Sequence, residues 1–349
     1  MIKSMDKKEV SPVNAAKPAT LKTLAAYLHL DPTTISVVLN NVPGRSIPEP
    51  TRERIRAAAR KFNYHPSLVA RSLRSRRTMT IGILIPALSE PYEGEVLTGI
   101  GDYLLENDYF YFIAHHGHRA NLIETYPQML VSRGAEGLIL VDTQVDHPMP
   151  VPAVALAGKR RLQGVTNVVL DHKAAAELVL KHLYDLGHCK LAFMRGQPFS
   201  SDAFPRWEST VKAAGALGLE IHPELTLQLE EDIHSPELGY RLTRQLLQHH
   251  RDFTAMVSFN DMAAAGAIRA LHEAGLRVPE DVSVVGFDDI PWAGFQTPSL
   301  TTVRQPLHEM GRLSAELLLE RIRSEAVGPA QVAVKPQLVA RESTSVARP

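Results

Sequence analysis

Cysteine is almost absent from this sequence, and so are long apolar runs. The one cysteine among 349 residues, Cys189, excludes an intramolecular disulfide and suits a reducing compartment. We expect it to be a semi-buried residue ahead of a strand. No stretch approaches the roughly 18 to 20 apolar residues of a membrane-spanning helix, and residues 1–19 lack the hydrophobic core of an export signal. We therefore predict a cytoplasmic protein without a membrane partner, which begins with a disordered leader over 1–19.

Several catalytic and cofactor motifs are also missing. The sequence contains no Gly-x-Ser-x-Gly turn, no Walker-type phosphate loop and no His-Glu-x-x-His zinc pair. The segment GIGDYL at 99–104 lacks the third glycine of a dinucleotide-binding loop and lies within a predicted helix. The histidines of HHGH at 115–118 end a predicted strand and have no identifiable carboxylate partner. We expect a protein that is not an enzyme and that needs no cofactor and no metal.

Charge is distributed unevenly along the chain, although the formal net charge is zero. Residues 1–80 contain 15 Lys and Arg against 5 Asp and Glu, a balance of +10, and the remaining 23 against 33 leave −10. A basic N-terminal segment on an acidic body is typical of a phosphate-binding module joined to a second domain. A solvated basic surface is the alternative interpretation.

The pattern from Thr20 predicts two short helices with a tight turn between them. Thr20 is a favourable N-cap, and apolar residues recur at helical spacing over 21–28. His29 begins a turn of about three residues. Asp31 then caps a second helix with Pro32 at its first position, where the missing N–H of proline costs nothing.

The second predicted helix presents a short, uncharged polar face. Ile35, Val38 and Leu39 can pack inward against the first helix. The residues expected to face outward are Thr33, Thr34, Ser36 and Val37. Small hydroxyl side chains let a helix approach a DNA duplex closely and bond phosphates or base edges. A third helix, predicted over about 49–62, carries arginines and a lysine on its outer side.

The stretch YHPSLVARSLRSRRT at 64–78 has the apolar spacing of a helix but is too short to fold alone. Pro66 limits it on one side and arginines follow Leu73 on the other, which leaves about eight residues. Isolated helices of fewer than roughly 12 residues are marginal in water because nucleation is unfavourable. This segment therefore needs a partner in order to fold.

Together, TLKTLAAYLHLDPTTISVVLN and TRERIRAAARKFNYHPSLVARSL resemble the head of LacI/GalR-type bacterial transcription regulators. The resemblance implies a helix-turn-helix domain over 20–65 and a linker over 66–78. Within the linker, residues 67–73 would form a hinge helix that folds when two copies meet in the minor groove of an operator, where Leu73 wedges between base pairs. The DNA-contacting positions implied by the resemblance are Thr20, Pro32, Thr33, Thr34, Ser36, Val37, Asn40, Tyr64, His65, Ser67, Ala70 and Leu73.

The sequence departs from the family pattern at several of these positions. His29 stands in the turn where relatives often have glycine, and histidine tolerates a positive φ better than most residues. Val37 replaces an arginine of many relatives, and Pro32 and Thr33 fill the positions that most distinguish one operator from another. We expect this protein to read different bases.

From residue 79 the composition changes to apolar strands that alternate with helices. The predicted strands lie in 79–88, 109–116, 137–141, 153–156, 165–171, 190–196, 254–261, 282–289 and 300–303. The helical stretches between them include 95–106, 173–186, 206–217, 237–249, 262–274 and 307–323. Such a pattern indicates parallel sheets covered on both faces. We predict an α/β body of two doubly wound parallel-sheet lobes, similar to periplasmic binding proteins, that enclose a cleft at the carboxyl ends of the strands.

The resemblance to the LacI/GalR family extends over roughly 20–342 and places an effector-binding and dimerisation domain at 79–342. The predicted N-lobe covers about 79–171 and 304–330, and the predicted C-lobe covers about 172–303 and 331–342. Asp171, at the first crossover between the lobes, is either a ligand contact or a helix cap.

Polar residues that end the predicted strands are the candidate ligand-binding groups. SFND ends in Asn260 and Asp261, GFDD ends in Asp288 and Asp289, and Arg206 starts a helix. Amide, carboxylate and guanidinium groups can bond the hydroxyls or the carboxylate of a small polar molecule, although Asn-Asp after a strand is also a helix cap. The effector-binding positions implied by the resemblance are Arg206, Asn260 and Asp288, with Tyr92 and His234 as further ring contacts.

These features predict a cytoplasmic, nucleoid-associated transcription regulator that is a repressor. It would bind operator DNA as a homodimer and respond to a small molecule in the cleft. A sugar or sugar acid is the leading interpretation of that effector, and a purine or nucleoside is the second. The alternative is a solute-binding protein with the same two-lobed body, which the basic head and the missing export signal oppose.

Overall fold

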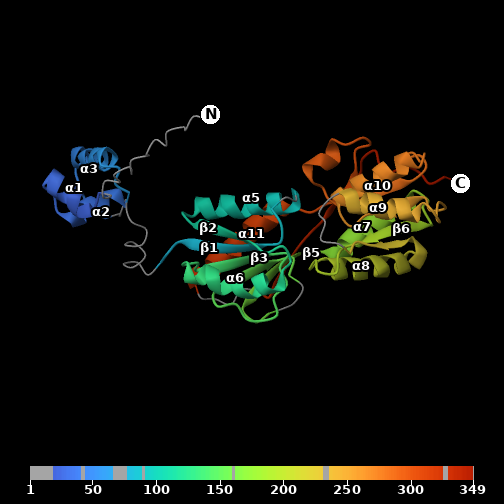
Figure 1. Ribbon diagram of the computed structural model, residues 1–349, viewed down its shortest axis with the longest axis horizontal. Helices are drawn as coiled ribbons and strands as arrows, with labels where there is room; N and C mark the ends of the chain where they lie inside the picture. The colour runs from blue at the N-terminus through green and yellow to red at the C-terminus, as the bar shows by residue number, and fades with distance from the viewer. Residues whose placement is uncertain are drawn as a thin grey trace, which may run out of the picture. The chain divides into compact units, whose positions relative to one another are not determined.

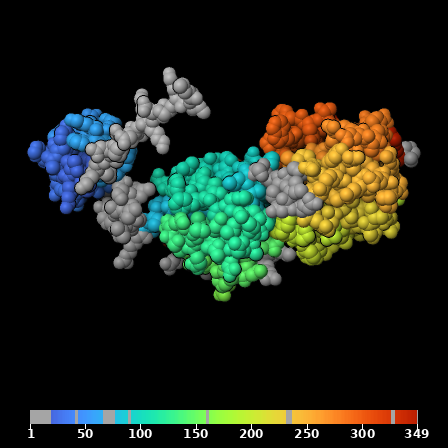
Figure 2. Space-filling view, viewed as in Figure 1, coloured from blue at the N-terminus to red at the C-terminus, as the bar shows by residue number. Residues whose placement is uncertain are grey.

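The computed structural model describes residues 19–40, 44–65, 77–88, 91–158, 162–230, 236–324 and 329–348. The chain divides into two compact units, Met1–Thr78 and Met79–Pro349. We call the described part of the first unit the head and the second unit the body (Figures 1 and 2). Nearly all of the predicted leader and the predicted hinge helix at 67–73 lie outside the described residues.

The head consists of three short helices around a small apolar core. They are α1 (Leu21–Leu28), α2 (Pro32–Leu39) and α3 (Glu49–Lys61), as predicted (Figure 1). The buried core residues are Leu24, Leu28, Ile35, Val38, Ile55, Ala58 and Ala59. His29 ends α1 in the left-handed region at φ 52°, so the turn keeps the backbone geometry that the family pattern requires without glycine.

The body contains two six-stranded sheets, one in each lobe. The N-lobe strands are β1 (Thr80–Ile85), β2 (Phe110–His115), β3 (Gly137–Val141), β4 (Ala153–Leu156), β5 (Val165–Leu170) and β11 (Gln331–Val334). The C-lobe strands are β6 (Leu191–Arg195), β7 (Thr226–Gln228), β8 (Ala255–Val257), β9 (Ser283–Asp288), β10 (Thr301–Arg304) and β12 (Gln337–Val339). The strand orders are β11-β5-β4-β3-β1-β2 and β12-β10-β9-β8-β6-β7, and the pairs are parallel except that β12 is antiparallel to β10.

Helices cover both faces of each sheet, which confirms the doubly wound prediction. The N-lobe helices are α5 (Pro91–Glu106), α6 (Ala120–Ser132) and α11 (Leu307–Ser324). The C-lobe helices are α7 (His172–Asp185), α8 (Ala203–Ala216), α9 (Pro236–Leu246) and α10 (Asp261–Glu273), with 3-10 turns η1 (Pro223–Leu225) and η2 (Pro291–Gly294). Four separate apolar clusters, two in each lobe, join the helices to the sheets.

The last lobe boundary differs from the prediction. Residues 331–342 were expected to belong entirely to the C-lobe, but β11 pairs in parallel with β5 in the N-lobe sheet, and only β12 joins the C-lobe. The chain therefore crosses between the lobes near Asp171, between Arg304 and Leu307, and between β11 and β12. These edge strands are three or four residues long and mix polar with apolar side chains, so the sequence gives little sign of which sheet each one joins.

Two glycines allow α5 and α11 to pack at close range. A Cβ on Gly99 would clash with the backbone oxygen of His308, and a Cβ on Gly311 would clash with that of Val96. Gly99 is the first glycine of the GIGDYL segment, and its role in the structure is to allow this helix packing.

Within the described residues no helix is long and apolar enough to cross a membrane, and no cluster of His, Cys, Asp and Glu could hold a metal ion. Cys189 is exposed rather than semi-buried, because the turn ahead of β6 leaves it at the surface.

Candidate functional site

The N-terminal turn of α2 presents the predicted DNA-contacting side chains at the surface. Asp31 caps the helix, because its Oδ1 accepts a hydrogen bond from the Thr33 amide at 2.7 Å. Hydrogen bonds from the Thr33 hydroxyl and amide hold the pKa of the Asp31 carboxyl below its ordinary value. Pro32 and Thr33 are exposed and Thr34 is half-buried. This capped turn carries short side chains, as close approach to a duplex requires.

Val37 was predicted to face outward, but it is buried. Its side chain is only 9% exposed, although Thr33, one turn earlier on the same side of α2, is exposed. The buried residues of α2 are Ile35, Val37 and Val38, so the buried side of the helix is wider than the apolar spacing predicted. The accessible polar face of α2 is therefore concentrated at its N-terminal turn.

Three other predicted DNA-contacting side chains make hydrogen bonds inside the head. The Asn40 amide donates to Ser36 O at 2.7 Å and to Ser36 Oγ at 3.2 Å. Thr20 Oγ1 accepts from the Thr23 amide at 3.2 Å and caps α1. These bonds fix the orientation of polar groups at the ends of α1 and α2.

Tyr64 and His65, the last predicted DNA contacts among the described residues of the head, follow α3. Tyr64 is half-buried against the core, and this burial raises the pKa of its hydroxyl. His65 is exposed, with Nε2 3.2 Å from Asn63 Oδ1. The other predicted residues that fall outside the described ranges are Ser67, Ala70, Leu73 and, from the effector set, His234.

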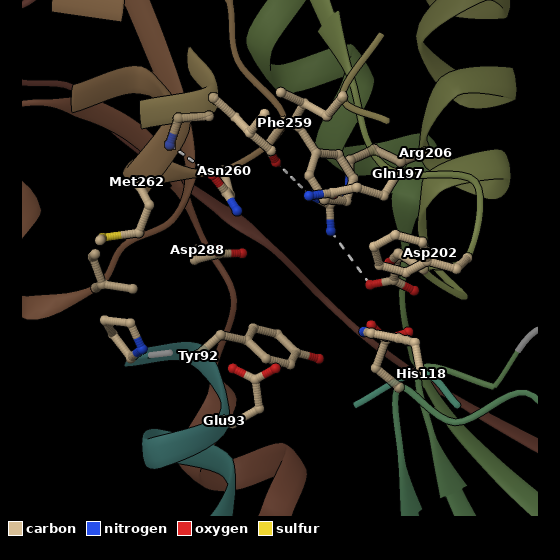
Figure 3. Close-up of a pocket in the computed structure, with 18 residues that line it drawn as sticks. Tyr92, Glu93, His118, Gln197, Asp202, Arg206, Phe259, Asn260, Met262 and Asp288 are labelled. Carbon is tan, nitrogen blue, oxygen red and sulfur yellow. Dashed lines mark hydrogen bonds and ion pairs between the residues drawn. The ribbon is translucent and has the colours of Figure 1, made fainter. Parts of the chain in front are cut away.

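A cleft with about 820 Å³ of space, its open mouth included, lies between the two lobes of the body (Figure 3). The N-lobe side of its lining includes Pro91, Tyr92, Glu93, His118 and Asp142. The C-lobe side includes Gln197, Phe199, Ser200, Asp202, Arg206, Phe259, Asn260, Met262, Asp288 and Ile290. The structure thus brings together Tyr92, Arg206, Asn260 and Asp288, which lie far apart in the sequence.

Arg206 is held firmly in the C-lobe wall of the cleft. Its Nη1 donates to Phe259 O at 2.6 Å, and its Nη2 lies 3.3 Å from Asp202 Oδ2. The guanidinium also lies over the rings of Phe259 and Phe287, with its carbon 4.4 and 3.7 Å from the ring centroids. A ligand would therefore meet a guanidinium whose position is already fixed.

The buried Asp202 is the ion-pair partner of Arg206. Its other oxygen, Oδ1, lies 3.1 Å from His172 Nε2. Burial opposes ionisation, but His172 and Arg206 together hold the pKa of the Asp202 carboxyl below its ordinary value. Asp202 therefore remains an anion that neutralises Arg206.

Asp288 follows β9 and enters the cleft from a left-handed backbone conformation, at φ 115°. Its Oδ1 accepts a hydrogen bond from Gln305 Nε2 at 2.6 Å. Burial and the nearby Asp261 carboxylate raise the pKa of the Asp288 carboxyl well above its ordinary value. Asp261 connects α10 to two neighbouring segments, because it accepts hydrogen bonds from the Thr302 hydroxyl in β10 at 2.5 Å and from the Ile290 amide at 2.9 Å.

Asn260 and Tyr92 face the cleft from opposite lobes (Figure 3). Asn260 is a helix cap as well as a lining residue, since its Oδ1 accepts from the Ala263 amide at 2.8 Å. Its amide nitrogen points into the cleft. The Tyr92 hydroxyl is buried and has no hydrogen-bond partner among the described residues.

Sequence reasoning missed several acidic and polar lining residues. Asp142 directly follows β3, so the strand-end argument that selected Asp288 applies equally to it. Asp202 lies four residues before Arg206, a spacing that joins side chains on a helix. Gln197 likewise follows the strand predicted at 190–196. Glu93 carried no comparable signal, because burial in a cleft between two lobes is not visible in local sequence.

Asp171 and the HHGH segment have structural roles. Asp171 caps α7, because its Oδ1 accepts from the Ala174 amide at 3.0 Å. His116 is fully buried, with Nε2 2.9 Å from Thr143 Oγ1, and burial lowers its pKa to about 4. The His118 ring in the N-lobe packs against the Phe199 ring in the C-lobe, with the ring centroids 4.2 Å apart, and this contact joins the two lobes beside the cleft.

Comparison with known proteins gives consistent matches over nearly the whole chain. A family model described as a periplasmic binding protein-like domain matches residues 180–344. The chain is 32% identical over 337 residues to the HTH-type transcriptional repressor PurR of Haemophilus influenzae, covering 93% of this chain and 98% of that protein. It is 30% identical over 331 residues to the ribose operon repressor of the same species, with the same coverage.

Two solved structures resemble this one closely. The lac repressor dimer bound to operator and the anti-inducer ONPF has a TM-score of 0.82 at 27% identity, covering 94% of this chain and 100% of that chain. The complex of the transcriptional regulator CelR with cellobiose has a TM-score of 0.69 at 27% identity, covering 93% and 99%.

Proposed function

Because the chain belongs to the LacI family of transcriptional repressors, which are not enzymes, we propose that a small molecule in the cleft controls its binding to one specific operator. The observation that carries this proposal is the cleft itself. Its polar groups come from both lobes, so a ligand that bonds both sides favours one relative orientation of the lobes. We propose that this orientation is transmitted to paired heads in a cytoplasmic homodimer.

The proposed DNA-binding surface is the N-terminal turn of α2 with the basic side of α3. Arg54, Arg56 and Arg60 are exposed on α3, which suits contacts with phosphates. Selection of bound sites from random duplex DNA tests the proposal directly and should return a near-palindromic sequence. If about six phosphates are contacted, affinity should fall on the order of 10³-fold between 50 and 200 mM salt. Failure to enrich any site would favour the alternative, a solute-binding protein.

Exposed apolar groups on the body support the proposed dimer. In the described N-lobe sheet, β2 is an edge strand, and Phe110, Phe112 and Ile113 on it are exposed. In the C-lobe, Trp292 and Phe295 at η2 are 69% and 82% exposed. Apolar side chains on an unpaired edge are typical of a surface that pairs with another chain.

A double variant, Phe110→Glu with Phe112→Glu, tests this interface. It should shift sedimentation from dimer toward monomer and weaken operator binding, and an unchanged sedimentation profile would contradict this interface.

We propose a sugar or sugar derivative as the effector, with a nucleobase or nucleoside as the second candidate. Several carboxylates and amides around a compact cleft suit the many hydroxyls of a sugar. Relatives give each candidate a precedent, since one is the ribose operon repressor, another is PurR, and a third was solved with cellobiose. The test is to add each class to the protein-operator complex and to measure a change in operator affinity. A protein that binds its operator but responds to neither class would overturn the effector assignment alone.

A further inference from the structure

A second pocket lies inside the C-lobe, between the helices α7 and α8 and the sheet, and we call it the C-lobe hollow. Its space is about 510 Å³, the open mouth included, against about 820 Å³ for the cleft. Arg206 and Phe259 line both, so the hollow and the cleft share a wall, whose cleft side Figure 3 shows. The other described residues of the two linings differ. The C-lobe hollow therefore adjoins the candidate effector site but is separate from it, and its ligand should be smaller.

The lining of the C-lobe hollow is mostly apolar. Its aromatic side chains are Phe193, Trp207, Phe259 and Phe287. The helices contribute short side chains, Ala175 and Ala176 from α7 and Ala203 from α8, which leave room between the helices and the sheet. Aromatic rings favour offset or edge-to-face contacts, and Phe193 and Trp207 already make one, with centroids 5.9 Å apart and planes at 75°. These walls suit the flat ring of a small aromatic molecule.

Arg195 brings a positive charge to this apolar lining. It is half-buried at the end of β6, and its guanidinium carbon lies 4.9 Å from the centroid of the Trp207 ring. A contact with the face of a ring uses the charge of a guanidinium but none of its five N–H donors. The Arg195 Nε atom is buried and has no hydrogen-bond partner among the described residues. Such a donor is costly unless a ligand or water bonds it.

No acid balances this charge within the described lining. The lining contains two guanidinium groups, Arg195 and Arg206, and no carboxyl group. Arg206 pairs with Asp202, which belongs to the lining of the cleft. Arg195 is therefore the group of the C-lobe hollow that an anionic ligand would meet with its donors available.

From this combination we infer that the C-lobe hollow binds a small aromatic carboxylate, with its ring between the helices and the sheet and its carboxylate on Arg195. A guanidinium and a carboxylate form two parallel charge-assisted hydrogen bonds, and the apolar walls take the ring out of water. A neutral aromatic molecule leaves the guanidinium without an anion, and a small anion without a ring leaves the walls uncovered. The inference goes beyond the proposed function, because this site is distinct from the effector cleft.

The test uses ligands that share one ring and differ in charge. Benzoate, phenylacetate and cinnamate are compared with their neutral amides, with benzylamine as a cation and with acetate as an anion without a ring. Binding to the full-length protein is measured by calorimetry. At least one aromatic carboxylate should bind about tenfold or more tightly than its amide and than acetate, since hydrogen bonds to charged groups are the stronger ones. Tighter binding of an amide or of benzylamine, or no binding by any aromatic carboxylate, overturns the inference.

Tryptophan fluorescence reports where the ligand binds. The chain has two tryptophans, Trp207 in the lining of the hollow and Trp292 at η2. In a Trp292→Phe background the tryptophan emission comes from Trp207 alone. The aromatic carboxylate should change this emission with the same half-saturation that calorimetry gives. Calorimetric binding with unchanged Trp207 emission would place the ligand elsewhere and contradict the inference.

A pair of variants isolates the charge of Arg195. Arg195→Gln removes the guanidinium and should weaken binding of the carboxylate by about tenfold or more, while changing the affinity for the matching amide much less. Arg244→Gln is the matched control, because Arg244 also lies over an aromatic ring, that of Tyr240 at 5.5 Å, but is outside the lining of the hollow. Equal losses for acid and amide in Arg195→Gln, or the same loss in Arg244→Gln, would contradict a charge-based site.

Operator binding, measured in the same preparations, separates this inference from the proposed function. A protein that binds its operator but no aromatic carboxylate would overturn the inference and leave the proposed function in place. A protein that binds the carboxylate through Arg195 but selects no DNA site would support the C-lobe hollow and contradict the proposed function.

Discussion

The head and the body differ in the side chains that their candidate binding surfaces present. The head presents short polar groups such as Thr33 at its surface, over a small apolar core that these groups do not disturb. The body gathers acids inside a cleft, where burial and mutual repulsion oppose their ionisation. Substitutions at the candidate DNA-binding surface of the head should therefore affect binding alone, whereas substitutions in the cleft should affect binding and folding together.

The largest effect is expected at the buried ion pair between Arg206 and Asp202 in the lining of the cleft. Arg206→Ala leaves the buried Asp202 with His172 as its remaining partner, and breaking a buried ion pair typically costs about 3 to 5 kcal/mol. The unfolding temperature of the body should fall and ligand binding should be lost, as calorimetry would show. Arg269→Ala removes an exposed pair with Glu273 on α10 and serves as the control that leaves stability unchanged. A normal unfolding temperature in Arg206→Ala would show that the pair adds nothing to stability.

A substitution in the core of the head should unfold it without changing its surface residues. Ile55 is fully buried in its core, and Ile→Ala changes typically cost about 2 to 5 kcal/mol, which is comparable to the whole stability of so small a unit. Ile55→Ala should abolish operator binding while ligand binding by the body continues. Ile139→Ala, in the body core, should instead lower the unfolding temperature of the body. Simultaneous loss of both functions in Ile55→Ala would contradict the independence of the two units.

The cost of ionising the buried Asp142 carboxyl in the cleft can be measured from the pH dependence of unfolding. Asp142 has its pKa raised from 3.8 to about 6, so its favourable contribution is complete below pH 3.8 and is lost as the pH rises through about 6. Asp142→Asn keeps an oxygen that can accept the Ser201 amide hydrogen bond and should stabilise the body at pH 8 by about 3 kcal/mol. At pH 4 the variant and the parent protein should differ little. Denaturant unfolding at the two pH values gives the answer, and a variant less stable than the parent at pH 8 would reverse the expected sign.

The smallest effect is expected on the surface of the head. Thr34→Val keeps the shape of the side chain and removes one hydroxyl from the first turn of α2. Operator affinity, measured by anisotropy on the selected site, should fall by about 1 kcal/mol, the usual worth of one hydrogen bond. Circular dichroism melting should be unchanged. A shift in melting temperature of several degrees would show that surface recognition and folding of the head are coupled after all.

Local signals predicted most of the fold. The Asp31 cap with Pro32 fixed the start of α2, and each predicted apolar run of the body became a strand. The helix α6 was missed because Pro127 interrupts its pattern, yet Pro127 is buried within the helix. Strands β7, β11 and β12 were missed because they are short, and pairing at the sheet edges decides their structure more than their composition does.

The candidate cleft was predicted in outline only. Arg206, Asn260 and Asp288 were found because they match a family pattern at strand and helix ends, and the structure places all three in one lining. The gathering of carboxyl groups from both lobes was not predicted, because Glu93 and Asp142 lie in one lobe and Asp288 in the other. Their proximity depends on contacts between distant segments, which local spacing does not encode.

The three crossings between the lobes constrain how a nascent chain can assemble. The N-lobe is completed by α11 and β11, which lie beyond residue 306, so a ribosome must synthesise most of the protein before that lobe can close. The C-lobe, apart from β12 and the segment that follows it, is encoded by one continuous stretch and can mature earlier. A frameshift or nonsense codon between residues 306 and 331 would therefore leave an incomplete N-lobe sheet beside a nearly finished C-lobe, and such a product should be a target for chaperones and proteases.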